Sequence, residues 1–217
     1  MALILNLESS TRNCSVSISL NGEELVLCET ATPDYQHAEK LHEFVLWAFE
    51  ACDYQLQDLD AVAVGKGPGS YTGLRIGVAA AKGFCFSLGI PLIALNSLEI
   101  MANANLPECD LIIPMTDARR KEVYTAVFDK ELNIISATEA KILDEKSFQE
   151  FDDKRIVFLG DGAEKAKTIL NLSHATFLPE ILPSAGDMHA LSFKKFQQEK
   201  FEDIAYFEPL YLKDFVG

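Results

Sequence analysis

Positive charge is scarce in this sequence. It holds 19 lysines and arginines against 33 aspartates and glutamates, a net charge of -14 at pH 7. Proteins that bind nucleic acid by themselves are basic over at least one face, because they neutralise backbone phosphates. The one basic run, Arg119-Arg120-Lys121, is followed at once by Glu122. We therefore expect no direct nucleic-acid binding by this chain alone, although a partner protein that carries RNA is compatible with its charge.

Closely spaced cysteine pairs of the Cys-x-x-Cys type are also absent. The five cysteines are far apart and odd in number: Cys14, Cys28, Cys52, Cys85 and Cys109. This favours reduced thiols over a disulfide framework or a zinc ribbon. The first residues reach Asn6 and Glu8 too early for a signal peptide. We expect a cytoplasmic protein.

No long hydrophobic run is uninterrupted. The longest apolar zone, residues 73–95, contains Arg75, Lys82 and Pro91, whereas a membrane helix needs about 20 consecutive apolar residues. We expect no membrane association. The composition, 48% hydrophobic and 24% charged over 217 residues, is typical of a globular protein with one large or two small domains.

The hydrophobic pattern predicts alternating strands and helices in two lobes. The predicted strands are residues 3–7, 15–20, 24–29, 59–64, 91–95, 111–116, 122–128, 133–142 and 156–159. The predicted helices are residues 36–52, 72–88, 97–104, a segment from 160 to about 170, and 188–198. Three strands followed by helix, strand and helix is the order of the actin/hexokinase/Hsp70 class, so we predict an α/β fold with a mixed sheet in each lobe. The lobes are predicted at 1–105 and 106–217, with the last segment packing back on the first.

A glycine-rich connection follows the strand predicted at 59–64. A P-loop requires Gly-Lys-Ser/Thr, but the only Gly-Lys here precedes Gly67. The dinucleotide pattern Gly-x-Gly-x-x-Gly starts at Gly65 and fails at Ser70. Neither general phosphate-binding motif therefore describes this loop. Ser70 also lacks His and Asp companions at a recognisable spacing, so we interpret it as a hydroxyl at a helix start and predict no catalytic residue.

The same loop resembles the signature of a known family. It reads Gly67-Pro68-Gly69-Ser70-Tyr71-Thr72-Gly73-Leu74-Arg75-Ile76-Gly77. Further matching segments are residues 4–10, 90–92 with 97–99, 117–124 and 209–212. In this order and spacing they are similar to the TsaB (YeaZ) family, and they extend over almost the whole chain. The resemblance implies the actin/hexokinase/Hsp70-like (ASKHA) fold. The motif residues whose role it leaves open are Gly67, Pro68, Gly69, Ser70, Thr72, Arg75, Asp117, Arg119 and Glu122.

The resemblance also implies a function. Proteins of this family are non-catalytic subunits required for N6-threonylcarbamoylation of the adenosine beside the anticodon, in tRNAs reading codons that begin with adenine. The implied partners are a TsaD-like catalytic relative, a TsaE-like P-loop ATPase, tRNA indirectly through the complex, and a second copy when the chain is alone. No cofactor is implied, except a nucleotide at an interface of the complex. The alternative is an independent ATP-binding phosphotransferase or ATPase of the actin-like class.

The end of the first predicted strand is where these alternatives differ. In actin-like phosphotransferases this turn faces the nucleotide phosphates, so Glu8, Ser9 and Ser10 are candidate cofactor-binding residues. The other interpretation is a hydroxyl-rich turn whose side chains bind nearby backbone. We favour the second, because Glu8 replaces the family's shorter aspartate at this position.

Two histidines on the first predicted helix raise the question of a metal. Catalytic relatives of the family carry His-x-x-x-His, but His37 and His42 are five residues apart. That spacing separates them by roughly 140° around a helix, so they do not chelate one ion. We predict no metal site, which argues against a metallopeptidase.

The helices predicted at 36–52 and 72–88 suggest a protein interface. The second is apolar almost all round, and Trp47 falls on the charged side of the first, where a tryptophan is a typical interface anchor. A helix pair buried within one domain is the alternative. The predicted interface residues are His37, Leu41, Phe44, Trp47, Ala48, Gly73, Ile76, Gly77, Ala80 and Phe84. For the turn with Asp117, Arg119 and Glu122, ligand contact and a plain ion-paired turn remain equal alternatives.

Overall fold

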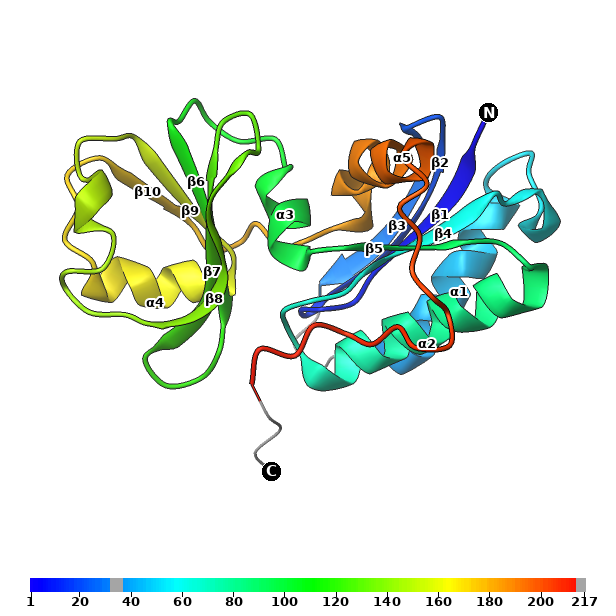
Figure 1. The fold of residues 1–217 in the computed structure, drawn as a ribbon, viewed down its shortest axis with the longest axis horizontal. Helices are drawn as coiled ribbons and strands as arrows, with labels where there is room; N and C mark the ends of the chain where they lie inside the picture. Colours follow the sequence, from blue (N-terminus) through cyan, green and yellow to red (C-terminus); the bar gives the residue numbers. More distant parts are fainter. Residues whose placement is uncertain (32–36, 214–217) are drawn as a thin grey trace. The chain divides into compact units, whose positions relative to one another are not determined.

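The computed structural model describes residues 1–31 and 37–213, apart from the side chains of residues 37 and 38. The chain forms two compact units (Figure 1). Unit 1 comprises residues 1–100 and 183–217, and unit 2 comprises residues 101–182. The sequence prediction assigned all of 106–217 to the second lobe apart from a returning last segment. In the structure the chain returns to unit 1 already at Pro183. Ala185 and Met188 are buried there in a cluster with Ile4 of the first strand.

The described residues of unit 1 form five strands and the helices α1, α2 and α5, and α3 crosses the boundary between the two units in the sequence. Its first half comprises β1 (Leu3–Glu8), β2 (Asn13–Leu20), β3 (Glu23–Ala31), α1 (His37–Glu50) and the short helix η1 (Leu56–Asp58). It continues with β4 (Ala61–Gly65), α2 (Tyr71–Leu88), β5 (Leu92–Leu95) and α3 (Ser97–Ala102). The returning segment adds η3 (Ala185–Asp187) and α5 (His189–Gln197).

Unit 2 is smaller. It contains β6 (Leu111–Asp117), β7 (Glu122–Asp129), β8 (Ile134–Ile142), η2 (Gln149–Phe151), β9 (Ile156–Leu159), α4 (Asp161–Ile169) and β10 (Ala175–Leu178). The sequence analysis did not predict β10. It is a four-residue strand that pairs with β9 alone, so its alternation is too short for a clear signal.

The two sheets have the same topology. Their strand orders are β3-β2-β1-β4-β5 and β10-β9-β6-β7-β8. In each sheet the first strand is central, the next two add antiparallel on one side, and the last two add parallel on the other. This confirms the predicted actin/hexokinase/Hsp70-like fold with a mixed sheet in each lobe.

Helices cover both faces of the sheet in unit 1 (Figure 1). Alternate side chains of a strand point to opposite faces of the sheet. Because both faces are covered here, every residue of β1 is buried. Leu5 packs in the cluster that holds Leu41 of α1 and Val78 of α2, whereas Ile4 packs with the returning segment. A strand buried on both faces reads as a nearly continuous apolar run, which is why the sequence located β1 correctly.

The core of unit 2 lies between its sheet and α4. Met115 of β6, Phe158 of β9 and Ala163 of α4 belong to one buried cluster. The edge strand β8 stays open, and Ile134 and Ile142 are more than half exposed, at 67% and 70%. Within residues 1–31 and 37–213, no helix combines the length and apolar character needed to cross a bilayer.

Candidate functional site

The turn after β1 is buried inside unit 1. Glu8, Ser9 and Ser10 have no exposed surface. The Ser10 backbone N–H donates to Glu8 Oε1 at 2.6 Å, and the Ser97 hydroxyl donates to Glu8 Oε2 at 3.1 Å. Burial raises the pKa of Glu8, and these hydrogen bonds oppose that rise. Both carboxylate oxygens are thus satisfied by donors from within the protein.

The first turn of α2 closes over this strand end. The Ser70 N–H donates to the Ser10 carbonyl at 2.6 Å, and the Ser9 hydroxyl donates to the Gly73 carbonyl at 2.9 Å. The Ser70 hydroxyl caps the helix by accepting from the Gly73 N–H at 3.3 Å. Ser70 therefore sits at the helix start, as its sequence context indicated. The Ser9 hydroxyl and the Ser10 carbonyl of this turn are thus both bound to backbone groups of α2 and its cap.

Two glycines of the family motif make this close approach feasible. A Cβ atom at Gly69 would overlap the Ser10 carbonyl, and one at Gly77 would overlap the Ser9 hydroxyl. Glycine at position 69 lets two backbone segments meet, and glycine at position 77 leaves room for the Ser9 side chain. The glycine pattern thus has a structural reason within unit 1. Gly67 joins the same network, because its N–H donates to the Ser97 hydroxyl at 3.2 Å.

The C-terminal segment crosses α2 and fastens the loop from the other side. The Leu210 N–H donates to the Lys66 carbonyl at 2.7 Å, and Lys82 Nζ donates to the Phe207 carbonyl at 3.1 Å. Arg75 lies 4.2 Å over the Tyr71 ring and donates to the Tyr211 hydroxyl at 3.4 Å. The motif around 209–212 and the motif around Arg75 are therefore spatial neighbours. Sequence reasoning did not connect them, because their contact spans 136 residues.

The predicted interface residues fall into three groups, and one group requires a correction. Leu41, Phe44, Ala48, Gly73 and Gly77 are buried in unit 1. Leu41, Phe44 and Ala48 pack in the core of unit 1, and the two glycines lie against Ser9 of the turn, so none of the five forms an outer surface. Ile76, Ala80 and Phe84 are half-buried, and Trp47 is 49% exposed. The side chain of His37 lies outside the described residues.

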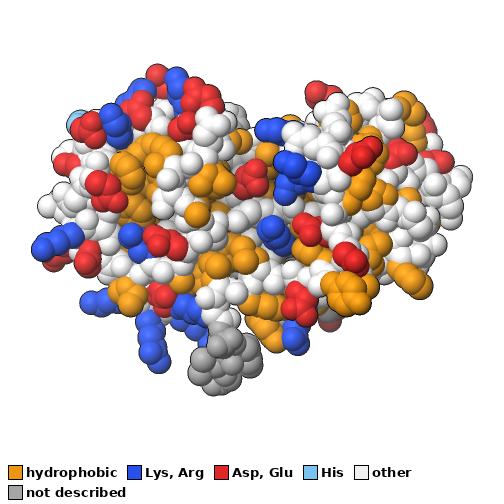
Figure 2. All heavy atoms as spheres, in the orientation of Figure 1, with side chains coloured by type: hydrophobic (Ala, Val, Ile, Leu, Met, Phe, Trp, Pro, Cys, Tyr) orange, Lys and Arg blue, Asp and Glu red, His pale blue; other side chains and the backbone are white. Residues whose placement is uncertain are grey.

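Several large apolar residues remain exposed or half-exposed on these two helices, and we call them together the α1–α2 surface; Trp47 and Phe84 of the predicted set belong to it. It consists of Leu46, Trp47 and Phe86, which are 65%, 49% and 83% exposed, together with half-buried Phe84 and Phe49. Figure 2 shows hydrophobic side chains gathered over the α2 region. The sequence contained Leu46 and Phe86, but assigning them to the outside required the phase of each helix against its sheet.

A hollow belongs to this surface. It has a volume of about 540 Å³ and lies between α1, the segment around η1 and α2. Its lining residues are His42, Val45, Leu46, Phe49, Glu50, Tyr54, Gln55, Leu56, Gln57 and Phe84. Apolar hollows of this size accept a side chain or a small ligand. His42 lies at its wall, with its ring centroid 6.0 Å from that of Phe84, and the described residues contain no group of three or more His, Cys, Asp or Glu suited to a metal ion.

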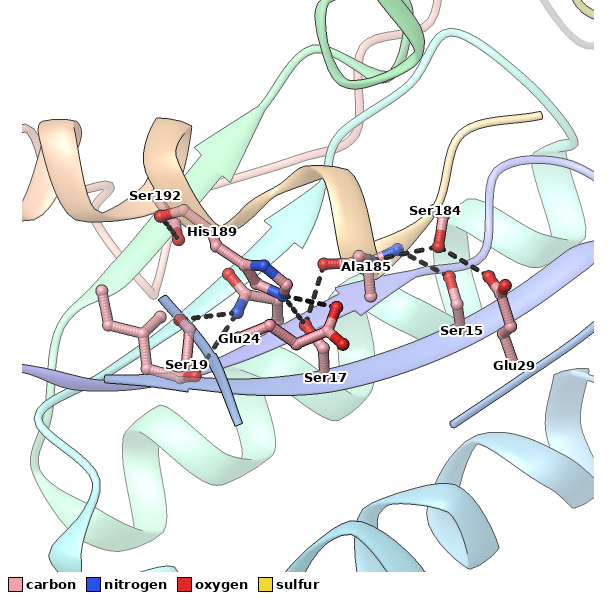
Figure 3. Close-up of polar contacts among 12 residues, drawn as sticks. Ser15, Ser17, Ser19, Glu24, Glu29, Ser184, Ala185, His189 and Ser192 are labelled. Atoms are coloured by element: carbon pink, nitrogen blue, oxygen red, sulfur yellow. Dashed lines mark hydrogen bonds and ion pairs between the residues drawn. The ribbon is translucent and has the colours of Figure 1, made fainter. Parts of the chain in front are cut away.

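A polar seam joins the returning segment to β2 (Figure 3). The Ser17 hydroxyl donates to the Ala185 carbonyl at 2.8 Å, and the Ala185 N–H donates to the Ser15 hydroxyl at 2.8 Å. His189 Nε2 lies 2.9 Å from Ser17 Oγ. Because the Ser17 proton is already donated, His189 is the donor in this contact.

Two ionisable groups of this seam are shifted in opposite directions. Burial lowers the pKa of His189 to about 4, so the imidazole is neutral at pH 7. Burial, with the negative charges of Glu29 and Glu24, raises the pKa of Asp187 to about 6. Glu24 Oε2 lies 3.8 Å from His189 Nε2. At pH 7 the seam therefore combines a neutral imidazole with a carboxylate that takes up a proton near pH 6.

The turn between β6 and β7 is exposed. Asp117 Oδ1 accepts from the Arg119 N–H at 2.6 Å and from Lys165 Nζ at 2.7 Å, and Lys165 also donates to the Glu122 carbonyl at 2.9 Å. The ion pair of this turn thus links it to α4, not to Arg119.

Comparisons with known proteins agree with this fold. The sequence profile described as "TsaD: tRNA N6-adenosine threonylcarbamoyltransferase" matches residues 31–215. The Bacillus subtilis (strain 168) protein named tRNA threonylcarbamoyladenosine biosynthesis protein TsaB is 34% identical over 171 residues, covering 74% of this chain and 72% of the relative. The Escherichia coli (strain K12) protein of the same name is 28% identical over 228 residues, covering 99% of this chain and 96% of the relative.

A solved structure covers the chain almost completely. YeaZ from Pseudomonas aeruginosa superposes with a TM-score of 0.87 at 25% identity, covering 98% of this chain and 100% of that chain. The profile match, the Bacillus relative and this structure agree with the motifs found in the sequence. The chain belongs to the TsaB (YeaZ) family.

Proposed function

We propose that this chain is a non-catalytic subunit in the biosynthesis of N6-threonylcarbamoyladenosine in tRNA. It acts by docking a TsaD-like catalytic subunit, and the assembly admits a TsaE-like ATPase. The target is the adenosine beside the anticodon in tRNAs that read codons beginning with adenine. The names of the Bacillus and Escherichia relatives support the pathway.

The α1–α2 surface is the observation that carries the docking role. Leu46, Trp47 and Phe86 expose large apolar side chains on neighbouring helices, and Leu46 also lines a hollow of about 540 Å³. Aromatic side chains on an outer surface are the usual anchors of a protein interface. Burial of such side chains against a partner contributes roughly 25 cal/mol per Å² of apolar surface before the costs of association. A catalytic relative with its own apolar helix pair is the partner that fits.

The closed turn supports an accessory role over an independent phosphotransferase. Glu8, Ser9 and Ser10 are fully buried, and the backbone of Gly73 takes the hydroxyl of Ser9. A nucleotide phosphate at this turn would require α2 to move away from it. The isolated chain is therefore expected to bind ATP poorly. Tight ATP binding by the isolated chain, abolished by Glu8→Ala, would favour the phosphotransferase instead.

Docking is tested with exposed residues only. The double variant Trp47→Ala with Phe86→Ala should weaken binding to the TsaD-like protein of the same organism at least about 30-fold, equivalent to about 2 kcal/mol. Isothermal titration calorimetry measures this affinity. Tyr206→Ala is the matched control, because Tyr206 is 85% exposed on the C-terminal segment of unit 1.

Each outcome has a defined meaning. Loss of binding in the double variant with normal binding by Tyr206→Ala supports docking through the α1–α2 surface. Equal affinities for wild type and the double variant contradict this surface. If the wild-type chain itself does not bind the TsaD-like protein, the proposed function is wrong.

A further inference from the structure

Three adjacent cations occupy the tip of the β6–β7 turn. Arg119, Arg120 and Lys121 are all exposed, and none makes a side-chain hydrogen bond or ion pair with another described residue. Other cations of unit 2 are paired, such as Lys165 with Asp117 and Arg155 with Asp110. In a chain with a net charge of -14, an unpaired basic tip is a local exception.

The backbone of the tip is fixed. Arg119 and Arg120 have φ values of 68° and 54°, in the left-handed region that few residues other than glycine adopt. The turn is closed by hydrogen bonds from the Ala118 N–H to the Glu122 carbonyl at 3.1 Å and from the Glu122 N–H to the Arg119 carbonyl at 3.2 Å. The Leu143 N–H also donates to the Lys121 carbonyl at 2.9 Å. The three side chains therefore start from a defined scaffold.

The nearest acid of the turn is neutralised from α4. Lys165 Nζ binds Asp117 Oδ1 at 2.7 Å, and Lys165 is only 18% exposed. The same ammonium group holds the Glu122 carbonyl. On the neighbouring strand, Lys141 pairs with Glu139 at 3.4 Å. Lys165 thus offsets the charge of Asp117, and Lys141 offsets that of Glu139. Neither of these two acids is therefore available to offset the positive charge of the tip.

We propose that this tip binds phosphates of the RNA backbone when the chain is assembled with its partners. The inference rests on the proposed function, which supplies an RNA substrate. Arginine presents a planar fork of donors that matches phosphate oxygens, and lysine adds a point charge. Contacts to backbone phosphates are made by basic and polar groups, whereas the anchors of a protein interface are mostly aromatic or arginine side chains in a well-packed centre. The acidity of the whole chain restricts the contact to this tip and makes it an auxiliary one.

The test uses the assembled complex of this chain with its TsaD-like and TsaE-like partners and a cognate tRNA transcript. The triple variant Arg119→Gln, Arg120→Gln, Lys121→Gln should bind tRNA about tenfold more weakly near physiological salt. Across a salt series, the slope of log K against log salt should be shallower by about 2 to 3, near one for each cation removed. Fluorescence anisotropy measures both quantities.

The matched control removes the same charge elsewhere. Lys146, Lys167 and Lys200 are exposed, and their triple replacement by Gln should leave the slope unchanged. An unchanged slope in the tip variant overturns the inference. Failure of the tip variant to assemble, while wild type assembles, also overturns it and assigns the tip to an acidic protein surface. Failure of the wild-type chain to assemble contradicts the proposed function itself.

Discussion

Unit 1 and unit 2 use one strand order to build different strand ends. In each unit the central first strand ends on an acid, Glu8 in β1 and Asp117 in β6. Glu8 is fully buried and bound by Ser10 and Ser97, whereas Asp117 is exposed and paired with Lys165. The same topological position therefore serves as an internal fastening in one unit and as an exposed charged turn in the other.

The helices that follow the fourth strand differ in the same way. The outer side of α2 carries Phe86, which is 83% exposed, beside small residues such as Gly83. The exposed residues of α4 are Glu164, Lys167 and Thr168. A polar outer face is typical of a helix that meets only water, and an apolar one indicates a partner. Docking is thus expected through unit 1.

A bulky side chain at Gly77, where α2 meets the turn after β1, should have the largest effect on the stability of the chain. Gly77→Leu places a side chain where the Ser9 hydroxyl now lies, so we expect a loss of more than about 4 kcal/mol in the free energy of unfolding. Urea denaturation measures it. Gly83→Leu on the same helix is the control, since no atom lies within 4 Å of the added Cβ, and it should stabilise by about 0.5–1 kcal/mol. Equal effects of both substitutions would refute the closed-turn description.

Removing the acid at each strand end compares the units directly. Glu8→Ala leaves the Ser10 N–H and the Ser97 hydroxyl without an acceptor in the interior, so unfolding should become easier by about 3 kcal/mol. Asp117→Ala loses an exposed ion pair and should cost about 0–1 kcal/mol. Denaturant titration of both variants gives the comparison. A cost for Asp117→Ala as large as that for Glu8→Ala would contradict it.

The polar seam of unit 1 predicts two opposite effects of pH. The folded pKa of His189, about 4, is below the unfolded value of 6.5, so its stabilising contribution is lost as pH falls from 6.5 to 4, by about 2–3 kcal/mol. The folded pKa of Asp187, about 6, is above 3.8, so its contribution is present at low pH and is lost as pH rises towards 6. The two trends offset each other in the wild type.

Single variants separate the two trends. His189→Gln should make the protein gain stability, relative to wild type, as pH falls from 6.5 to 4. The variant lacks the imidazole whose protonation destabilises the wild type over this range. Asp187→Asn should make it lose stability relative to wild type over the same range. Thermal melts at several pH values measure both. Parallel pH profiles for the two variants would show that these groups do not titrate as their burial predicts.

The exposed apolar residues should have the smallest effect on stability. Trp47→Ala and Phe86→Ala should each change the free energy of unfolding of the isolated chain by no more than about 0.5–1 kcal/mol. The reason is that Trp47 is already 49% exposed and Phe86 83% exposed to water. A large loss of stability would indicate that these residues serve unit 1 and not a partner.

Local features of this fold could be predicted from the sequence. The continuous apolar run of β1 located a fully buried strand, and the cap at Ser70 marked the start of α2. Which side of a helix faces outward was harder. Leu41 and Ala48 form an apolar stripe that a sequence does not assign to a sheet or to a partner, and the structure assigns both to the sheet.

Contacts between distant segments could not be predicted. Gly77 looked like a site of helix packing, but its small size is required by the Ser9 hydroxyl, 68 positions earlier in the chain. The pairing of Ser17 with His189 spans 172 residues, and no local pattern records it. Such pairs depend on the path of the whole chain, here on the return that begins at Pro183.

Hydrogen–deuterium exchange of the chain, free and bound to its TsaD-like partner, tests the docking claim most directly. The account predicts slower exchange on binding in peptides that cover the second half of α1, η1 and the second half of α2, with no change in α4. Protection confined to unit 2, or none in α1 and α2, would contradict docking through the α1–α2 surface.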